Sequence, residues 1–213
     1  TPLGPVAADR EFLARLQRLW GRDLFEGEFA HASEHSIELQ AVYLRSLGIT
    51  APIAPLLCDS LHSLVPPGMG PGEAGLLAAF VGALREALVQ DGRRVTLIAA
   101  VDLAHVGRRF GDSWLVDAAR ARQIGQDDRQ TLALVLAPDA DAFYEQVMRD
   151  NDARRICGLT PLYVLAALMA AEKRAGELLR YTQWIDSDGW SSVTFASAVF
   201  RSSCSTRQAA TAS

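Results

Sequence analysis

The chain has 213 residues, of which 49% are hydrophobic and 22% charged, and its net charge is −4. This composition is typical of a soluble globular protein, and the lack of a basic block argues against nucleic-acid binding. No apolar run reaches the roughly 18 residues that a membrane span needs, and no signal peptide is visible at the N-terminus.

Apolar periodicity and turn residues divide the chain into helices and strands. The pattern predicts helices over residues 9–20, after Ser36 up to Gly48, and over 73–90, 114–134, 139–149 and 161–174. Strands are predicted over 51–58 and 93–102, and two late strands, 178–185 and 191–200, are joined by the hairpin-like turn DSDG. We expect one α/β domain over residues 1–200, with a mixed, largely parallel sheet flanked by helices, and a disordered tail over 201–213.

The stretch EHSIELQ places Glu34 and His35 directly before an apolar helical run. Ser33 or Ser36 is a suitable N-cap for that helix. On this reading His35 is a first-turn residue without a task. The alternative is that His35 points into a cleft and Glu34 starts the helix or braces the site.

Asp102 and His105 follow the strongest predicted strand, RRVTLIAAVD. Ligands of open α/β sheets gather at the carboxyl ends of strands, and a carboxylate three residues from a histidine can orient or charge the imidazole. A surface aspartate and a histidine at a helix start would give the same pattern. Both readings remain open at this point.

Cys157 lies in the turn RRICGLTP, before a helix that Thr160 would cap and Pro161 would begin. The helix dipole lowers a thiol pKa at this position, and Arg154 and Arg155 could add to the effect. The alternative is a small buried apolar cysteine. The other cysteines are interpreted as a core residue (Cys58) and a tail residue (Cys204), and this sparse set indicates a reducing, cytoplasmic location.

Taken together, EHSIELQ, VDLAHVGRRFG, ICGLTPLYVL, YTQ and SSVTFASAVF resemble segments of the MEMO family, in the same order along nearly the whole chain. The bacterial and archaeal branch is called AmmeMemoRadiSam system protein B. The resemblance implies a fold similar to class III extradiol dioxygenases and a cleft that holds iron or copper. It implies metal ligation by Cys157, His35 and His105, and catalytic roles for Asp102, His105 and His35.

The family's P-H-A-G-Y-like and S-H-H-like motifs, which supply two histidine ligands, do not occur in these residues. We therefore expect an N-terminally truncated family member in which strands of the sheet are missing and metal is weakly held.

Three functions are compatible with the predicted cleft. The first is a metal-dependent oxidoreductase-like protein, because a thiolate beside imidazoles suits iron or copper better than magnesium or calcium. The second is a non-catalytic module that binds a small molecule or peptide in the same cleft. The third is a hydrolase with Cys157 as nucleophile and His105 as base.

Overall fold

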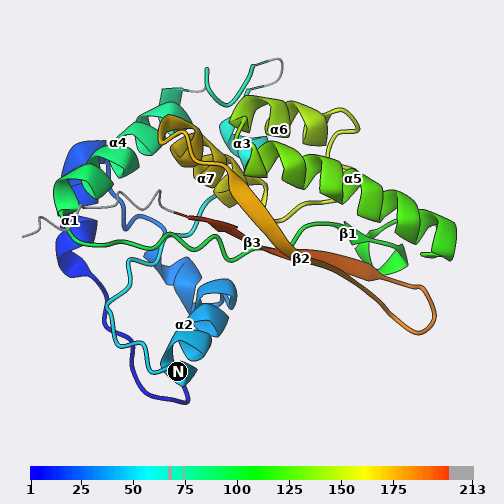
Figure 1. Ribbon diagram of the computed structural model, residues 1–213, viewed down its shortest axis with the longest axis horizontal. Coiled ribbons are helices and arrows are strands. Elements are labelled where there is room, and N and C mark those ends of the chain that lie inside the picture. The colour runs from blue at the N-terminus through cyan, green and yellow to red at the C-terminus, as the bar shows by residue number, and fades with distance from the viewer. Residues whose placement is uncertain (67–68, 74, 202–213) are drawn as a thin grey trace, which may run out of the picture.

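Helices pack around a small antiparallel sheet in the computed structural model of the chain (Figure 1), which describes residues 1–66, 69–73 and 75–201. The α-helices are α1 (Arg10–Trp20), α2 (Ser36–Ser46), α3 (Leu61–Leu64), α4 (Gly75–Asp91), α5 (Ala118–Leu136), α6 (Ala140–Met148) and α7 (Leu159–Ala171). The strands are β1 (His105–Val106), β2 (Gly176–Ile185) and β3 (Ser192–Phe200), and the short 3-10 helices η1 (Glu28–Ala32) and η2 (Arg108–Phe110) lie in loops. None of the described helices is long and apolar enough to cross a membrane.

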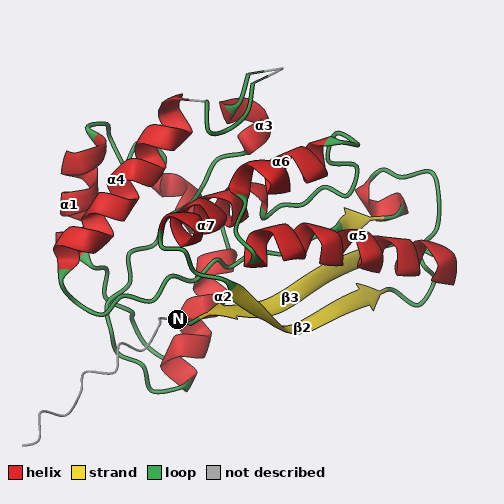
Figure 2. Cartoon of the chain, turned by 45° about the horizontal axis from the view of Figure 1, so that its top comes forward, coloured by secondary structure: helices red, strands yellow, loops and turns green. Residues whose placement is uncertain are grey.

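The sheet has the order β1-β3-β2, and both strand pairs are antiparallel. Strands β2 and β3 form the predicted late hairpin, which is confirmed from the pair Gly176–Phe200 to the pair Ile185–Ser192. Strand β1 pairs with β3 only through His105 and Val106. Helix α5 packs against both long strands (Figure 2).

The prediction of a largely parallel sheet is wrong, because the two strands that would have made it parallel are not strands. Residues 51–58 contribute one isolated parallel bridge, between Ile53 and Ala8. Residues 93–102 lie outside every described strand, although their sequence is β-branched and apolar. A strand is defined by a hydrogen-bonded neighbour, and the described part of the chain offers this segment none. The predicted tail over 201–213 lies, apart from Arg201, outside the described residues.

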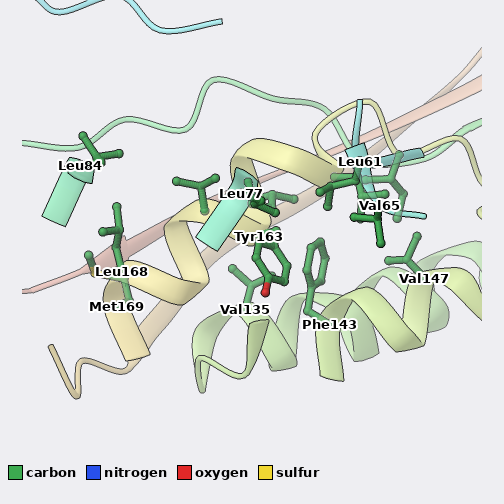
Figure 3. Close-up of a cluster of buried hydrophobic side chains, with 14 of the residues drawn as sticks. Leu61, Val65, Leu77, Leu84, Val135, Phe143, Val147, Tyr163, Leu168 and Met169 are labelled. Atoms are coloured by element: carbon green, nitrogen blue, oxygen red, sulfur yellow. The ribbon is translucent and has the colours of Figure 1, made fainter. Parts of the chain in front are cut away.

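Helix α7 forms the centre of the hydrophobic core, as expected for a helix that is apolar on all sides. Its buried side chains include Tyr163, Leu168 and Met169. Phe143 of α6 and Val135 of α5 pack into the same cluster (Figure 3). The helical layer is therefore the rigid body on which the loops before β1 and before α7 are held.

Candidate metal centre

Asp102, His105 and Cys157 come together at the point where the loop before β1 meets the loop before α7. One oxygen, nitrogen or sulfur atom from each residue lies within 4.8 Å of the others. The Nε2 atom of His105 is 3.8 Å from an Asp102 carboxylate oxygen. Ligand atoms that share one tetrahedral metal ion lie about 3.3–3.5 Å apart, as metal–ligand distances of about 2.0–2.3 Å require. Small side-chain adjustments would therefore let these three donors share one ion.

Two backbone carbonyl groups fix the imidazole of His105. Its Nδ1 atom lies 3.2 Å from the carbonyl oxygen of Leu103 and 3.3 Å from that of Arg155. Carbonyl oxygens only accept hydrogen bonds, so Nδ1 carries the proton and donates it. Nε2, which faces Asp102, is then left with a lone pair and is the atom able to bind a metal.

Arg155 and Asp112 brace the same region. The Arg155 guanidinium donates to both carboxylate oxygens of Asp112, at 2.9 and 3.2 Å, and to the carbonyl oxygen of His105 at 3.2 Å. Arg155 has a φ angle of 51°, a left-handed conformation that costs a non-glycine residue about 1–3 kcal/mol. These contacts hold the strained backbone two residues before Cys157 in place.

Gly158 allows the loop before α7 to approach the loop before β1. A Cβ atom at this position would lie 2.5 Å from the Cβ atom of Val101 and 2.9 Å from the carbonyl oxygen of Asp102. Any larger residue would push Cys157 away from Asp102. Helix α7 begins at Leu159, so the predicted N-cap role of Thr160 is wrong. The Thr160 hydroxyl instead donates to the carbonyl oxygen of Asp59 at 2.7 Å.

A buried ionic cluster around Asp128 of α5 fixes both loops from below. Asp128 is fully buried and accepts hydrogen bonds from Arg154, Tyr181 and Thr194. The Thr194 hydroxyl accepts the backbone N–H of Ala104, and the Arg154 carbonyl oxygen accepts the N–H of His105 at 2.7 Å. Asp128 therefore links α5 and β3 to the backbone on both sides of the candidate site.

The electrostatic surroundings of Cys157 differ from those predicted by the sequence. Burial raises the pKa of its thiol, and the negative charges of Asp102 and Glu34 raise it further. The two arginines expected to lower this pKa are paired with acids, Arg154 with Asp128 and Arg155 with Asp112. The prediction of a lowered pKa is therefore wrong. An acid-rich site of this kind favours a bound cation over a free thiolate.

His35 lies outside the group formed by Asp102, His105 and Cys157. It occupies the N-cap position of α2, and its side chain is 82% exposed, with Nδ1 3.4 Å from Glu34. The Glu34 carboxylate accepts the backbone N–H groups of His35 and Ser36, so Glu34 starts the helix where a serine was predicted to do so. The start of α2 lies within electrostatic range of the Cys157 thiol, but the structure does not bring the His35 imidazole to it.

A cleft of about 590 Å³ opens beside Cys157 and is also lined by Cys58, His62 and Arg155. His62 was predicted to be an unpartnered surface residue, but its Nε2 atom lies 3.1 Å from Asp152. Cys58 was predicted to be a core residue and instead retains access to solvent. Its surroundings nevertheless raise its pKa to about 11. The cleft gives a small molecule a route to the sulfur of Cys157.

Fold and site together define an α/β protein with a candidate three-donor metal centre. The family model of the Memo-like proteins matches residues 1–199, and the chain belongs to this family. The family resemblance read from the sequence motifs is thereby confirmed.

Relatives in thermophilic microorganisms are similar over most of the chain. A MEMO1 family protein of Aquifex aeolicus is 27% identical over 201 residues, which are 94% of this chain and 49% of that protein. A MEMO1 family protein of Methanopyrus kandleri is 31% identical over 206 residues, covering 94% of this chain and 63% of that protein. A third, of Thermus thermophilus, is 33% identical over 129 residues, which are 59% of this chain and 34% of that protein. The chain thus spans about half the length of the Aquifex relative.

Asp112 and Asp128 are the residues around the site that sequence reasoning missed. Each is an ordinary acid within a loop or helix, without a neighbouring motif. Their importance depends on arginines 43 and 26 residues away, a pairing that no local pattern encodes.

Proposed function

We propose that Asp102, His105 and Cys157 bind one iron or copper ion and that the protein is a metal-dependent, oxidoreductase-like member of the Memo-like family. The observation that carries this proposal is the convergence of a carboxylate, an imidazole and a thiol within 4.8 Å. A soft sulfur ligand beside an imidazole selects transition metals over magnesium and calcium. Three protein ligands leave further coordination positions open, as in catalytic metal sites.

The protein's own groups would perform defined tasks around such an ion. A redox metal would supply one-electron chemistry when bound. His105 is held by its Nδ1–H so that Nε2 faces the site. The half-exposed carboxylate of Asp102 can ligate or accept a proton from a substrate, since it sits at the edge of the site. His35, on the neighbouring start of α2, remains a proposed substrate contact and not a ligand of this group.

Isothermal titration of the protein with Fe(II), Cu(II) and Zn(II) tests metal binding. We expect Cys157→Ser, His105→Ala and Asp102→Asn each to weaken the binding of the preferred metal at least tenfold, because each removes one of three donors. Cys58→Ser is the matched control and should leave binding unchanged. Oxygen consumption by the loaded protein with ascorbate then tests redox activity. Equal metal affinity in the wild type and in Cys157→Ser would refute the site.

A binding module without turnover is the second candidate, and the cleft of about 590 Å³ beside Cys157 favours it. Such a cleft can hold a small molecule or a peptide whether or not a metal is present. A metal-free protein that still binds a ligand in this cleft, with no oxygen consumption after metal loading, would support the module. The hydrolase reading is disfavoured, because the raised pKa of Cys157 opposes nucleophilic activation and its thiol contacts the carbonyl oxygen of Asp102.

A further inference from the structure

A second, larger groove of about 830 Å³ lies away from the candidate metal centre. One wall is the extended segment 93–103, and the opposite wall is the last part of β3, including Ala198, Val199 and Phe200. The floor consists of apolar side chains of α5 and α7. On the first wall, Val95, Leu97 and Ile98 are 43%, 38% and 53% exposed. These side chains are apolar and β-branched or leucine, and yet they face solvent.

The backbone of both walls is unpaired on the side of the groove. Among the described residues, the N–H and C=O groups of residues 94–101 make no hydrogen bond with another backbone group. Strand β3 pairs with β2 along its whole length, but on its other edge it is paired only near Ser192, Val193 and Thr194. The two walls therefore converge where Leu103 donates to Thr194 and separate from there on. They form two unpaired edges that face one groove.

An extended polypeptide is the occupant that satisfies this chemistry. A strand between the two walls would bond to the backbone of both and would cover the apolar side chains. An apolar small molecule would fill the floor but leave the two rows of polar backbone groups unpaired. Recognition of an added strand through main-chain bonds and side-chain pockets is a common binding mode of exposed sheet edges. The exposed Arg85 and Arg94 also line the groove and favour an acidic residue at one end of the strand.

We propose that this groove receives one β-strand, which pairs with residues 94–101 on one side and with residues 195–200 of β3 on the other. We infer that the strand is of the kind found in the longer relatives outside the part that matches this chain. The matched parts cover only 49% of the Aquifex protein and 63% of the Methanopyrus protein, so those proteins contain sequence available for this role. The groove does not include Asp102, His105 or Cys157, and so this inference does not depend on the proposed metal chemistry.

Synthetic peptides that tile the unmatched part of the Methanopyrus relative provide the probe. Fluorescence polarisation would measure the binding of each labelled peptide to the 213-residue chain. We expect binding to be confined to overlapping peptides that share one apolar, β-branched run. Methylation of alternate backbone nitrogens in that peptide should weaken binding at least tenfold, because it removes the main-chain donors. Failure of every peptide to bind, or indifference to methylation, would overturn the proposal.

Two lysine substitutions locate the site. Ile98→Lys places a charge in the groove and should weaken peptide binding at least tenfold. Leu39→Lys on α2 is the matched control, since Leu39 is 52% exposed and Ile98 53%, and it should leave binding unchanged. Circular dichroism would confirm that both variants fold. Equal binding by both variants would refute the groove as the site. Sedimentation that showed a dimer dissociated by Ile98→Lys would contradict the proposed strand and identify a second copy as the occupant.

Discussion

The segment that leads into β1 behaves differently at its two ends. Residues 94–101 are mostly exposed and unpaired, whereas Leu103 and Ala104 are buried and hydrogen-bonded to Thr194. Both parts have the same apolar, strand-like sequence. The difference is the presence of β3 beside one part only. Apolar sequence thus creates a tendency to form a strand, and a neighbouring edge decides whether the strand exists. Asp102 lies at the boundary between the two parts.

The order of the second part depends on the buried cluster below it, and removing Asp128 should have the largest effect. Asp128→Ala leaves the buried Arg154 guanidinium without its carboxylate, and we expect a loss of about 3–5 kcal/mol in the free energy of unfolding. Urea denaturation would measure it. Asp127→Ala on the same helix is the control, because Asp127 only accepts a bond from Gln123 and should change stability by about 0.5 kcal/mol or less. Similar losses in both variants would disprove the role of the cluster.

Truncation of one leucine in each part compares them directly. Leu103 is 3% exposed and Leu97 38%. We expect Leu103→Ala to cost about 2–5 kcal/mol, as for a buried leucine. Leu97→Ala should cost less than about 1 kcal/mol, because little area is removed from contact with protein. Thermal or urea unfolding of the two variants measures the difference. Equal costs would indicate that residues 94–101 are packed as tightly as the part that follows.

The close approach at Gly158 offers a smaller but more local test. Gly158→Ala introduces a Cβ atom 2.5 Å from Val101, and we expect about 1–3 kcal/mol of destabilisation from overpacking, together with weaker metal binding. Gly82→Ala in α4 is the control, because nothing lies within 4 Å of the added atom and alanine favours a helix by about 0.5–1 kcal/mol. A Gly158→Ala variant with unchanged stability and metal affinity would contradict the proposed contact.

The sequence predicted elements whose signals are local. Capping and apolar periodicity located α1, α4 and α5 to within a few residues, and β-branched runs around DSDG located the hairpin. The segment 93–102 failed because strand formation depends on a distant partner. For the site, position after a strand-like segment and before a helix was enough to select Asp102, His105 and Cys157. His35 had an equally suggestive motif, but its side chain turns to solvent.

The smallest expected effect concerns the thiol chemistry of Cys157. Because its pKa is raised, the thiol form dominates at neutral pH, and alkylation by iodoacetamide should be slow. The rate should rise about tenfold per pH unit until the pH passes the raised pKa. Cys58, with a pKa of about 11, should continue to accelerate up to that pH. Mass spectrometry of labelled peptides over a pH series measures both rates. Fast labelling of Cys157 that is already constant at neutral pH would contradict the raised pKa.

X-ray absorption at the edge of the bound metal tests the central claim most directly, because it reports the atoms that ligate the ion. For the iron- or copper-loaded protein, we predict one sulfur ligand at about 2.3 Å with nitrogen and oxygen ligands at about 2.0–2.2 Å. The sulfur signal should persist in Cys58→Ser and disappear in Cys157→Ser, whereas the nitrogen contribution should fall in His105→Ala. A bound metal without a sulfur ligand, or with one that remains in Cys157→Ser, would contradict the assignment of this centre.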